Sequence, residues 1–416
     1  MADSIVGSVI EYLAYDDDSL RDIALNWLCE GYLDEPTIAR AVFDQWDTRN
    51  PEIAFSQFPM LSYFPIPSEL IDETCQRAAE MVAQGRELTS LTTRCAGKLM
   101  EQLVRLPVKQ LEGHIQNITQ VTQSHKIFFR VDRDSLQSRL SLAQKTSDEL
   151  CELLDRSIEA LTQNAEDRRA LLSGQHALEA LRTNYPGILD LTAVFNEAES
   201  KSQRAKYSLQ LTLLSLAQFA DDSAYESHLS WLLHSPDLSL LSSALESLVR
   251  YGSGSAAQVL LEQFQTASET NRRWIARGLQ RMRIHNLAPL IAQLRDRVSD
   301  NTTWIMLLVA EMQQLDPKSG QRIMQAWNEL EAVNPTVVDA GLLYTFVCSP
   351  FHEKGQSSEL EMCYRDFLLR VQSGLGSVSS QSAEQADTRA NGQGRMEQRR
   401  QRSKQLEQLF KKRNRQ

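Results

Sequence analysis

An interval of 31 residues recurs in the second half of the chain, and it constrains the fold more than any other feature. Leu213, Ala244, Ile275 and Met306 stand at this interval, and each is followed by a second apolar residue. Two further rows keep the same interval: Ala217, Leu248, Leu279 and Ala310, and Leu229, Leu260 and Ile291. Apolar residues at helical spacing lie on one face, so each unit predicts amphipathic helices.

Polar turns precede the second helix of the last three units and supply its N-cap. They are Ser235-Pro236-Asp237, Ser268-Glu269-Thr270 and Ser299-Asp300-Asn301, and Ser and Asp side chains satisfy the free N–H groups at a helix start. Each unit is therefore a helix, a turn and a second helix. Such a hairpin cannot bury its apolar face alone, so neighbouring units must stack. We predict an all-α fold, an α-solenoid of antiparallel helix pairs, with a repeat region at residues 201–370.

The repeat resembles the short HEAT-like units of about 30 residues first named from phycobilin lyases. Those units have a small polar or acidic turn, then an apolar pair and a further apolar residue three positions on, as in Ser243–Leu248 (SALESL) and Trp274–Leu279 (WIARGL). The resemblance covers residues 205–315, although these units lack the family's regular Asp-Pro opening. It implies a right-handed superhelix with a concave face and does not imply one function.

Residues 1–200 predict a helical N-terminal region, either diverged repeats of the same solenoid or a separate bundle. Only 12 prolines and 17 glycines occur among 416 residues, which favours long helices with short connections. Residues 134–161 predict one long amphipathic helix. The β-like stretch 125–131 (HKIFFRV) predicts a connector or a helix start.

The C-terminal end has its own composition and charge. Residues 371–394 are rich in Ser, Gln, Gly and Ala and predict a disordered linker, and residues 395–416 predict a basic helical tail. From residue 389 onward there are ten Lys/Arg and two Asp/Glu, a charge of +8 against a total of −10, so the preceding chain carries −18. The predicted tail contacts are Arg399, Arg400, Arg402, Lys404, Lys411, Lys412 and Arg413. Such a tail binds RNA, a ribosome, an anionic membrane or an acidic protein, or it serves only as a solubilising end.

A row of arginines marks one repeat as the candidate binding surface. Arg273, Arg277 and Arg281 are four apart and share a helix face, and Arg250 is the repeat equivalent of Arg281. Guanidinium groups on such a face can hold phosphates or carboxylates with two parallel hydrogen bonds, and Trp274 adds a stacking surface. The alternative is a solvated face whose arginines pair with acids of neighbouring repeats, with Trp274 in the core.

The sequence contains no phosphate-binding, dinucleotide, zinc-protease or serine-hydrolase motif, so we assign no catalytic residue and no cofactor. Cys348, His352 and Cys363 have donor types that zinc prefers, but a fourth ligand is missing, and we assign no metal. The six cysteines are far apart, which favours reduced thiols. The chain also lacks a basic, apolar leader and any transmembrane segment. These features predict a cytoplasmic protein.

Two functions of different classes fit these patterns. The first is a non-enzymatic scaffold or adaptor that binds a protein partner through the concave surface of the repeats, with a second, charge-driven contact by the tail. The second is a nucleic-acid-binding HEAT-like protein, including one that processes DNA or RNA, that uses the arginine row and the tail. The acidic charge of the preceding chain argues against the second. An assembly factor, a chaperone-like protein or a lyase of the family that named the repeat is a third interpretation.

Overall fold

All secondary structure in the described part of the computed structural model is helical. The described residues are 2–14, 18–33, 35–48, 58–85, 90–164, 166–185, 229–230, 232–252, 254–330 and 334–348. Within them the chain forms helices, turns and connections, and no strand. The all-α prediction is therefore confirmed for this part of the molecule. The chain divides into two compact units, Met1–Asp316 and Pro317–Gln416.

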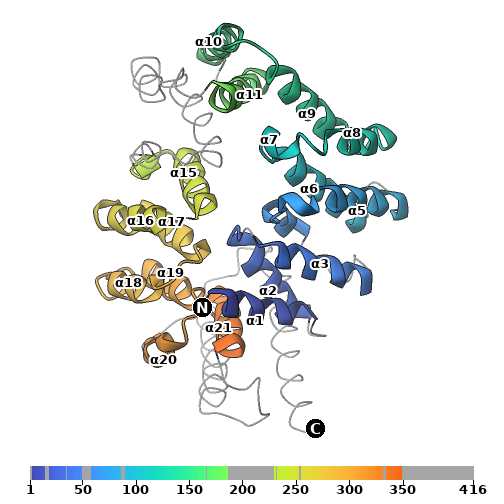
Figure 1. Cartoon of the computed structure of the whole chain (residues 1–416). Helices are drawn as coiled ribbons and strands as arrows, with labels where there is room; N and C mark the ends of the chain where they lie inside the picture. The colour runs from blue at the N-terminus through green and yellow to red at the C-terminus, as the bar shows by residue number, and fades with distance from the viewer. Residues whose placement is uncertain are drawn as a thin grey trace, which may run out of the picture. The chain divides into compact units, whose positions relative to one another are not determined.

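The first unit begins with a series of helices that is shown in blue to green in Figure 1. Their bounds are α1 Ala2–Glu11, α2 Asp18–Glu30, α3 Pro36–Thr48, α5 Ile71–Gln84, α6 Leu91–Arg105, α7 Val108–Leu111, α8 Ile115–Ser124, α9 Arg130–Leu142, α10 Ser147–Gln163 and α11 Arg168–Asn184. Three short 3-10 helices lie among them, at Tyr12–Ala14, Phe58–Tyr63 and Ser68–Leu70. The stretch 125–131 forms turns that lead into α9, in agreement with the predicted connector or helix start.

The single helix predicted over residues 134–161 is wrong, because the chain breaks between α9 and α10. Thr146 is the N-cap of α10, where its hydroxyl accepts a hydrogen bond from the Glu149 N–H at 3.4 Å. The Glu149 carboxylate in turn accepts one from the Thr146 N–H at 3.0 Å. This reciprocal pair is a capping box, which starts a new helix inside an apolar pattern that runs on through the break.

The 31-residue repeats form a second series of helices in the first unit. Their bounds are α15 Leu238–Tyr251, α16 Gly254–Thr266, α17 Glu269–Arg281, α18 Leu287–Arg295 and α19 Asn301–Met312. In these helices the periodic residues Leu248, Leu279 and Ala310 are fully buried, as are Leu260 and Ile291. The first members of two periodic rows, Leu213 and Ala217, lie outside the described residues.

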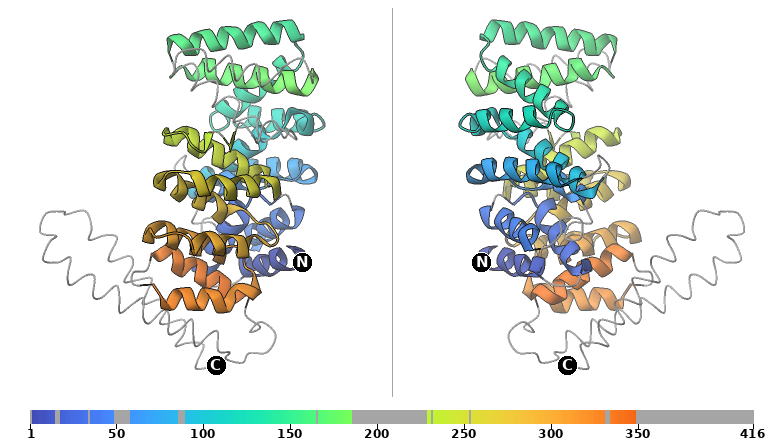
Figure 2. Two further views of the ribbon diagram at one scale, coloured as in Figure 1. Left: turned by 90° about the vertical axis from the view of Figure 1, so that its left-hand side faces the viewer. Right: turned by 90° about the vertical axis from the view of Figure 1, so that its right-hand side faces the viewer.

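The predicted turns cap the second helix of each described unit. The Ser268 hydroxyl accepts from the Asn271 N–H, and the Asp300 carboxylate accepts from the Thr303 N–H at 2.8 Å. The second helices α15, α17 and α19 pack on one another in sequence, and so do the first helices α16 and α18. Figure 2 shows these helices in layers from two further sides. One apolar core runs through them.

Within the first unit, α2 contacts the residues that follow repeat helices α17 and α19. The Trp27 indole N–H donates to the Gln313 carbonyl at 2.8 Å, just after the end of α19. The Arg283 guanidinium, just after α17, donates to the Trp27 carbonyl at 3.2 Å and lies 4.5 Å from the Trp27 ring centroid. Gly31 leaves room for this arrangement, since a Cβ there would lie 2.8 Å from Cγ of Arg283.

The second unit contains α20 Gly320–Asn328 and α21 Pro335–Cys348, preceded by a 3-10 turn at Pro317–Ser319. The domain boundary predicted at 200/201 falls outside the described residues, and the observed division between compact units comes at 316/317. The predicted linker and tail also lie outside the described residues. In the described part of the chain, no helix is long and apolar enough to cross a bilayer.

Candidate binding pocket and adjoining arginines

Arg250 and Arg281 lie together, as the repeat predicts, and they share one carboxylate. Glu246 of α15 accepts from Nε of Arg250 at 3.1 Å and from Nη1 of Arg281 at 2.6 Å. Only 16% of the Arg250 side chain and 14% of the Arg281 side chain are exposed. Both arginines are therefore held by an internal partner and are not free cations on a solvated face.

Two tyrosines from the N-terminal part of the first unit complete this cluster. The Tyr32 hydroxyl donates to Glu246, and the Arg250 guanidinium carbon lies 4.8 Å from the Tyr32 ring centroid. The Arg281 guanidinium lies 5.3 Å from the Tyr32 ring and 5.0 Å from the Tyr63 ring. Tyr32 has a φ of 46°, in the left-handed region, and it follows the end of α2. The backbone turn there directs this ring toward the repeats.

The charges of the cluster stabilise one another. Burial opposes ionisation of Glu246, yet hydrogen bonds and the charge of Arg281 hold the pKa of Glu246 below its ordinary value. Burial likewise opposes the charged form of Arg281, but Glu246 raises the pKa of Arg281 above its ordinary value. Burial raises the pKa of Tyr32, so its hydroxyl stays protonated and donates to the carboxylate. The cluster is thus an Arg–Glu–Arg group packed against two tyrosine rings.

The remaining arginines of the predicted row have different surroundings. Arg273 pairs with Glu269 at 2.5 Å and with Asp300, the N-cap of α19, at 3.2 Å. Arg277 is exposed, and its guanidinium carbon lies 5.9 Å from the ring centroid of half-buried Trp274. No carboxylate among the described residues forms an ion pair with Arg277. Three of the four arginines in the predicted row are therefore bound to carboxylates, and Arg277 is the exposed one.

The predicted tail contacts, Arg399 through Arg413, lie outside the described residues, as do His352 and Cys363. Cys29, Cys75 and Cys151 are free thiols. No cluster of His, Cys, Asp and Glu suited to a metal ion occurs in the described ranges.

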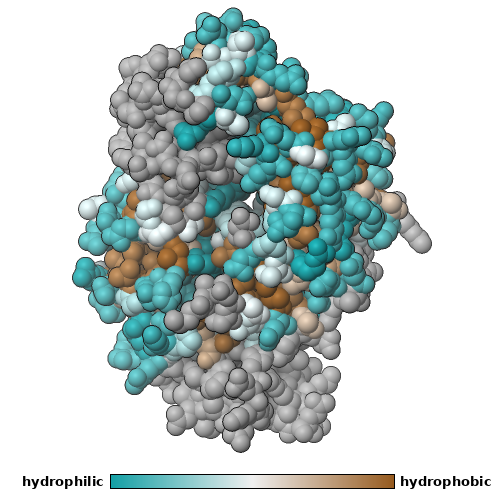
Figure 3. All heavy atoms as spheres, in the orientation of Figure 1, coloured by the Kyte–Doolittle hydropathy of each residue, from teal (hydrophilic) through white to brown (hydrophobic). Residues whose placement is uncertain are grey.

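On the face of the molecule seen in Figure 1, apolar residues form separate areas among hydrophilic ones (Figure 3).

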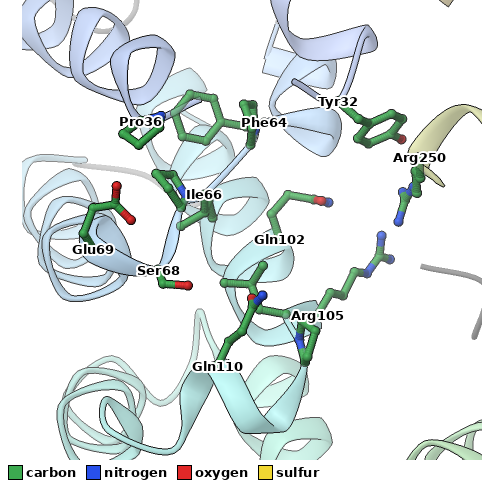
Figure 4. Close-up of a pocket in the computed structure, with 14 residues that line it drawn as sticks. Tyr32, Pro36, Phe64, Ile66, Ser68, Glu69, Gln102, Arg105, Gln110 and Arg250 are labelled. Atoms are coloured by element: carbon green, nitrogen blue, oxygen red, sulfur yellow. The ribbon is translucent and has the colours of Figure 1, made fainter. Parts of the chain in front are cut away.

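A cavity of about 470 Å³ opens beside Arg250. One wall is apolar and comes from the proline-rich segment between α3 and α5, with Phe64, Ile66 and their neighbouring prolines (Figure 4). Part of the polar lining comes from other elements, with Gln102 and Arg105 on α6, Gln110 on α7, Arg250 on α15 and Tyr32 after α2. Ser68 and Glu69, in the same segment as the apolar wall, supply the rest. This size falls within the range of about 300–1,000 Å³ typical of small-ligand sites.

Two guanidinium groups extend toward each other at one side of the cavity. Arg105 comes from the C-terminal end of α6 and Arg250 from α15, and Figure 4 shows their ends facing one another. The Gln102 amide points to the same side from α6 (Figure 4). Gln102 is 9% exposed, and its Nε2 has no hydrogen-bond partner among the described residues. A buried N–H group without a partner is costly, so this amide marks a place for an acceptor.

The cavity therefore combines an apolar wall with hydrogen-bond donors at one side. Sequence reasoning identified Arg250 but missed Tyr32, Tyr63, Gln102 and Arg105. No periodic signal marks these residues, because they come from separate segments that only the fold brings together. Pro59, Pro65 and Pro67 interrupt the chain in this segment and are a local sign of irregular structure there.

Comparisons with known proteins found no match: no family model, no curated protein and no solved structure is significantly similar to this chain. The resemblance to HEAT-like repeats consequently stays a prediction from the quoted motifs.

Proposed function

We propose that the chain is an α-solenoid of antiparallel helix pairs that serves as a cytoplasmic, non-enzymatic scaffold for a protein partner. The supporting packing is that of stacked hairpins, in which second helices α15, α17 and α19 contact one another and first helices α16 and α18 do the same. Solenoids present extended surfaces of this kind, which suit binding to another protein.

The observation that carries this proposal is the Trp274–Arg277 pair on α17. Trp274 packs partly against the repeat core, and exposed Arg277 lies against its ring without a carboxylate partner among the described residues. Trp and Arg dominate the energetics of protein interfaces because they combine a large contact area with directional hydrogen bonds. Neighbouring Arg273 is fixed by Glu269 and Asp300, so the rim of the surface is preorganised.

The nucleic-acid alternative has less support from the same geometry. Arg273 and Arg281 each have a carboxylate partner, which lowers the positive potential that an extended phosphate backbone would meet along the row. The basic tail remains a candidate for a second contact, which would raise the overall affinity through its tether.

The test is affinity capture of the tagged full-length chain from its native organism, with quantitative mass spectrometry. The variant Arg277→Glu reverses the charge of the proposed surface. The matched control Arg168→Glu makes the same change at an exposed position in the first turn of α11, where an acidic residue is compatible with the helix dipole. A parallel sample is treated with nuclease.

The proposal expects a reproducible protein that the wild type and Arg168→Glu retain and Arg277→Glu loses, with no effect of nuclease. Equal recovery of that protein with Arg277→Glu would contradict the proposed surface. Loss of all captured proteins after nuclease treatment would favour the nucleic-acid function instead.

A further inference from the structure

The two facing arginines, Arg105 and Arg250, each pair with a carboxylate on their own helix. Arg105 pairs with Glu101 at 2.5 Å, and Glu101 also pairs with Lys98 at 2.8 Å. On the opposite side, Glu246 is shared by Arg250 and Arg281. Each of these two carboxylates is thus shared by two cations.

Among the described residues that line the cavity, Glu69 is the one with a carboxyl group. Glu69 lines the cavity on the side away from Arg105 and Arg250 (Figure 4). Asp132 does not line the cavity. Burial, and then the charge of Glu101, raise the pKa of Asp132 to about 6, so this carboxyl group is largely ionised near pH 7 and interacts with Arg105 and Lys98. Two guanidinium groups that point toward each other repel unless an anion lies between them.

The geometry of the donors narrows the class of anion. Arg105 uses one terminal nitrogen for Glu101, and Arg250 uses Nε for Glu246, so each guanidinium retains N–H donors toward the cavity. Gln102 Nε2 adds a third donor without a partner. Gln102 and Arg105 come from α6 and Arg250 comes from α15, and three donors of this kind suit an oxyanion with several acceptor oxygens, such as a phosphate group.

We propose that this cavity binds a phosphate monoester, with the phosphate between Arg105, Arg250 and Gln102 and the ester's apolar group against Phe64 and Ile66. The site uses residues other than Trp274 and Arg277, so a result that contradicts the proposed partner surface does not contradict this site. The ester is supplied either by a free small molecule or by a phosphorylated side chain, since both present the same chemical group.

The test is isothermal titration calorimetry of the full-length protein with phenyl phosphate. Benzoate, a monoanion with the same ring, is titrated for comparison. Arg105→Gln removes one donor from a side chain that is 51% exposed, so the fold is expected to persist. Gln102→Leu removes the unpartnered amide, and Lys109→Gln is the control at an exposed position on α7 that does not line the cavity. Thermal unfolding of each variant confirms that it is folded.

The proposal expects saturable binding of phenyl phosphate to one site, competition by inorganic phosphate, and weaker binding of benzoate. Loss of a charge-assisted hydrogen bond weakens binding by about tenfold to a hundredfold, so Arg105→Gln should show a loss in that range. Gln102→Leu should show a smaller loss with no decrease in melting temperature, and Lys109→Gln should bind as the wild type does.

A further titration, with a short phosphotyrosine peptide, distinguishes the two sources of the ester. Tighter binding of a short phosphotyrosine peptide than of phenyl phosphate supports a phosphorylated protein, and equal binding supports a small molecule. The proposal is overturned if phenyl phosphate does not bind, if benzoate binds equally well, or if Lys109→Gln weakens binding as much as Arg105→Gln does.

Discussion

The buried ion pair between Arg139 of α9 and Glu179 of α11 gives the sharpest prediction about stability. Nε of Arg139 donates to the Glu179 carboxylate at 2.8 Å, and Nη2 donates to it at 2.5 Å. Nη1 donates to the Val104 carbonyl, and Nη2 also donates to the Leu106 carbonyl at 2.8 Å. Side-chain exposure is 5% for Arg139 and 9% for Glu179. One guanidinium therefore satisfies a buried carboxylate and the carbonyls that end α6.

Replacing Arg139 with Met keeps the side-chain volume and removes every one of these donors. Glu179 is left buried without its counter-charge, and loss of one partner of a buried pair costs about 3–5 kcal/mol. The double variant Arg139→Met/Glu179→Leu removes the stranded charge but leaves the two carbonyls without donors. Each unsatisfied group costs about 1–3 kcal/mol, so the double variant should recover only part of the loss.

Hydrogen exchange followed by mass spectrometry measures this loss where it occurs. A cost of 3–5 kcal/mol corresponds to about a 10²- to 10³·⁵-fold loss of protection, confined to the ends of α6 and α9 and to α11 if they open together. Arg156→Met on α10 is the control. The Arg156 side chain is 65% exposed and that of its partner Glu152 is 69% exposed, so this ion pair contributes little to stability. Protection in Arg139→Met within tenfold of the wild type, or full recovery in the double variant, would refute this reasoning.

Three further predictions concern other contacts. Gly31→Ala places a Cβ 2.8 Å from Cγ of Arg283, so we expect a loss of about 1–3 kcal/mol in urea unfolding; an unchanged midpoint would contradict the tight packing. Thr146→Ala removes the hydroxyl of the capping box and should cost about 1 kcal/mol in thermal unfolding, whereas no change would mean that the cap is not formed. Arg281 lowers the pKa of Glu246 from its ordinary 4.5, so the ionised carboxylate stabilises the fold above about pH 4.5. That stability is lost as the pH falls through the folded-state pKa, and Glu246→Gln should have a lower melting temperature near pH 7 and a flatter acid-side decline; parallel pH profiles would exclude the contribution.

The repeat helices were predictable because their signals are local and periodic. Leu260 and Ile291 repeat at a fixed interval and are fully buried, and Ser268 and Asp300 begin helices as their side-chain chemistry requires. The predicted adjacency of Arg250 and Arg281 followed from the same interval, since equivalent positions in stacked units are neighbours.

The features that were not predicted depend on individual contacts, which an apolar pattern in the sequence does not record. The break between α9 and α10 depends on one side chain, Thr146, whose cap outweighs a continuous apolar stripe. The contact between Tyr32 and Glu246 joins residues 214 positions apart, and no periodicity connects them. The cavity has the same origin, because its prolines, Gln102 and Arg250 come from separate segments.

The most direct test of the proposed scaffold function is site-specific photo-crosslinking in the native organism. A photoreactive amino acid replaces exposed Arg277 in the full-length chain, and Arg168 is replaced in the control. The proposal predicts that position 277 crosslinks to one defined protein and that position 168 does not. Identical crosslinking patterns from the two positions, or no protein crosslink at 277, would contradict it.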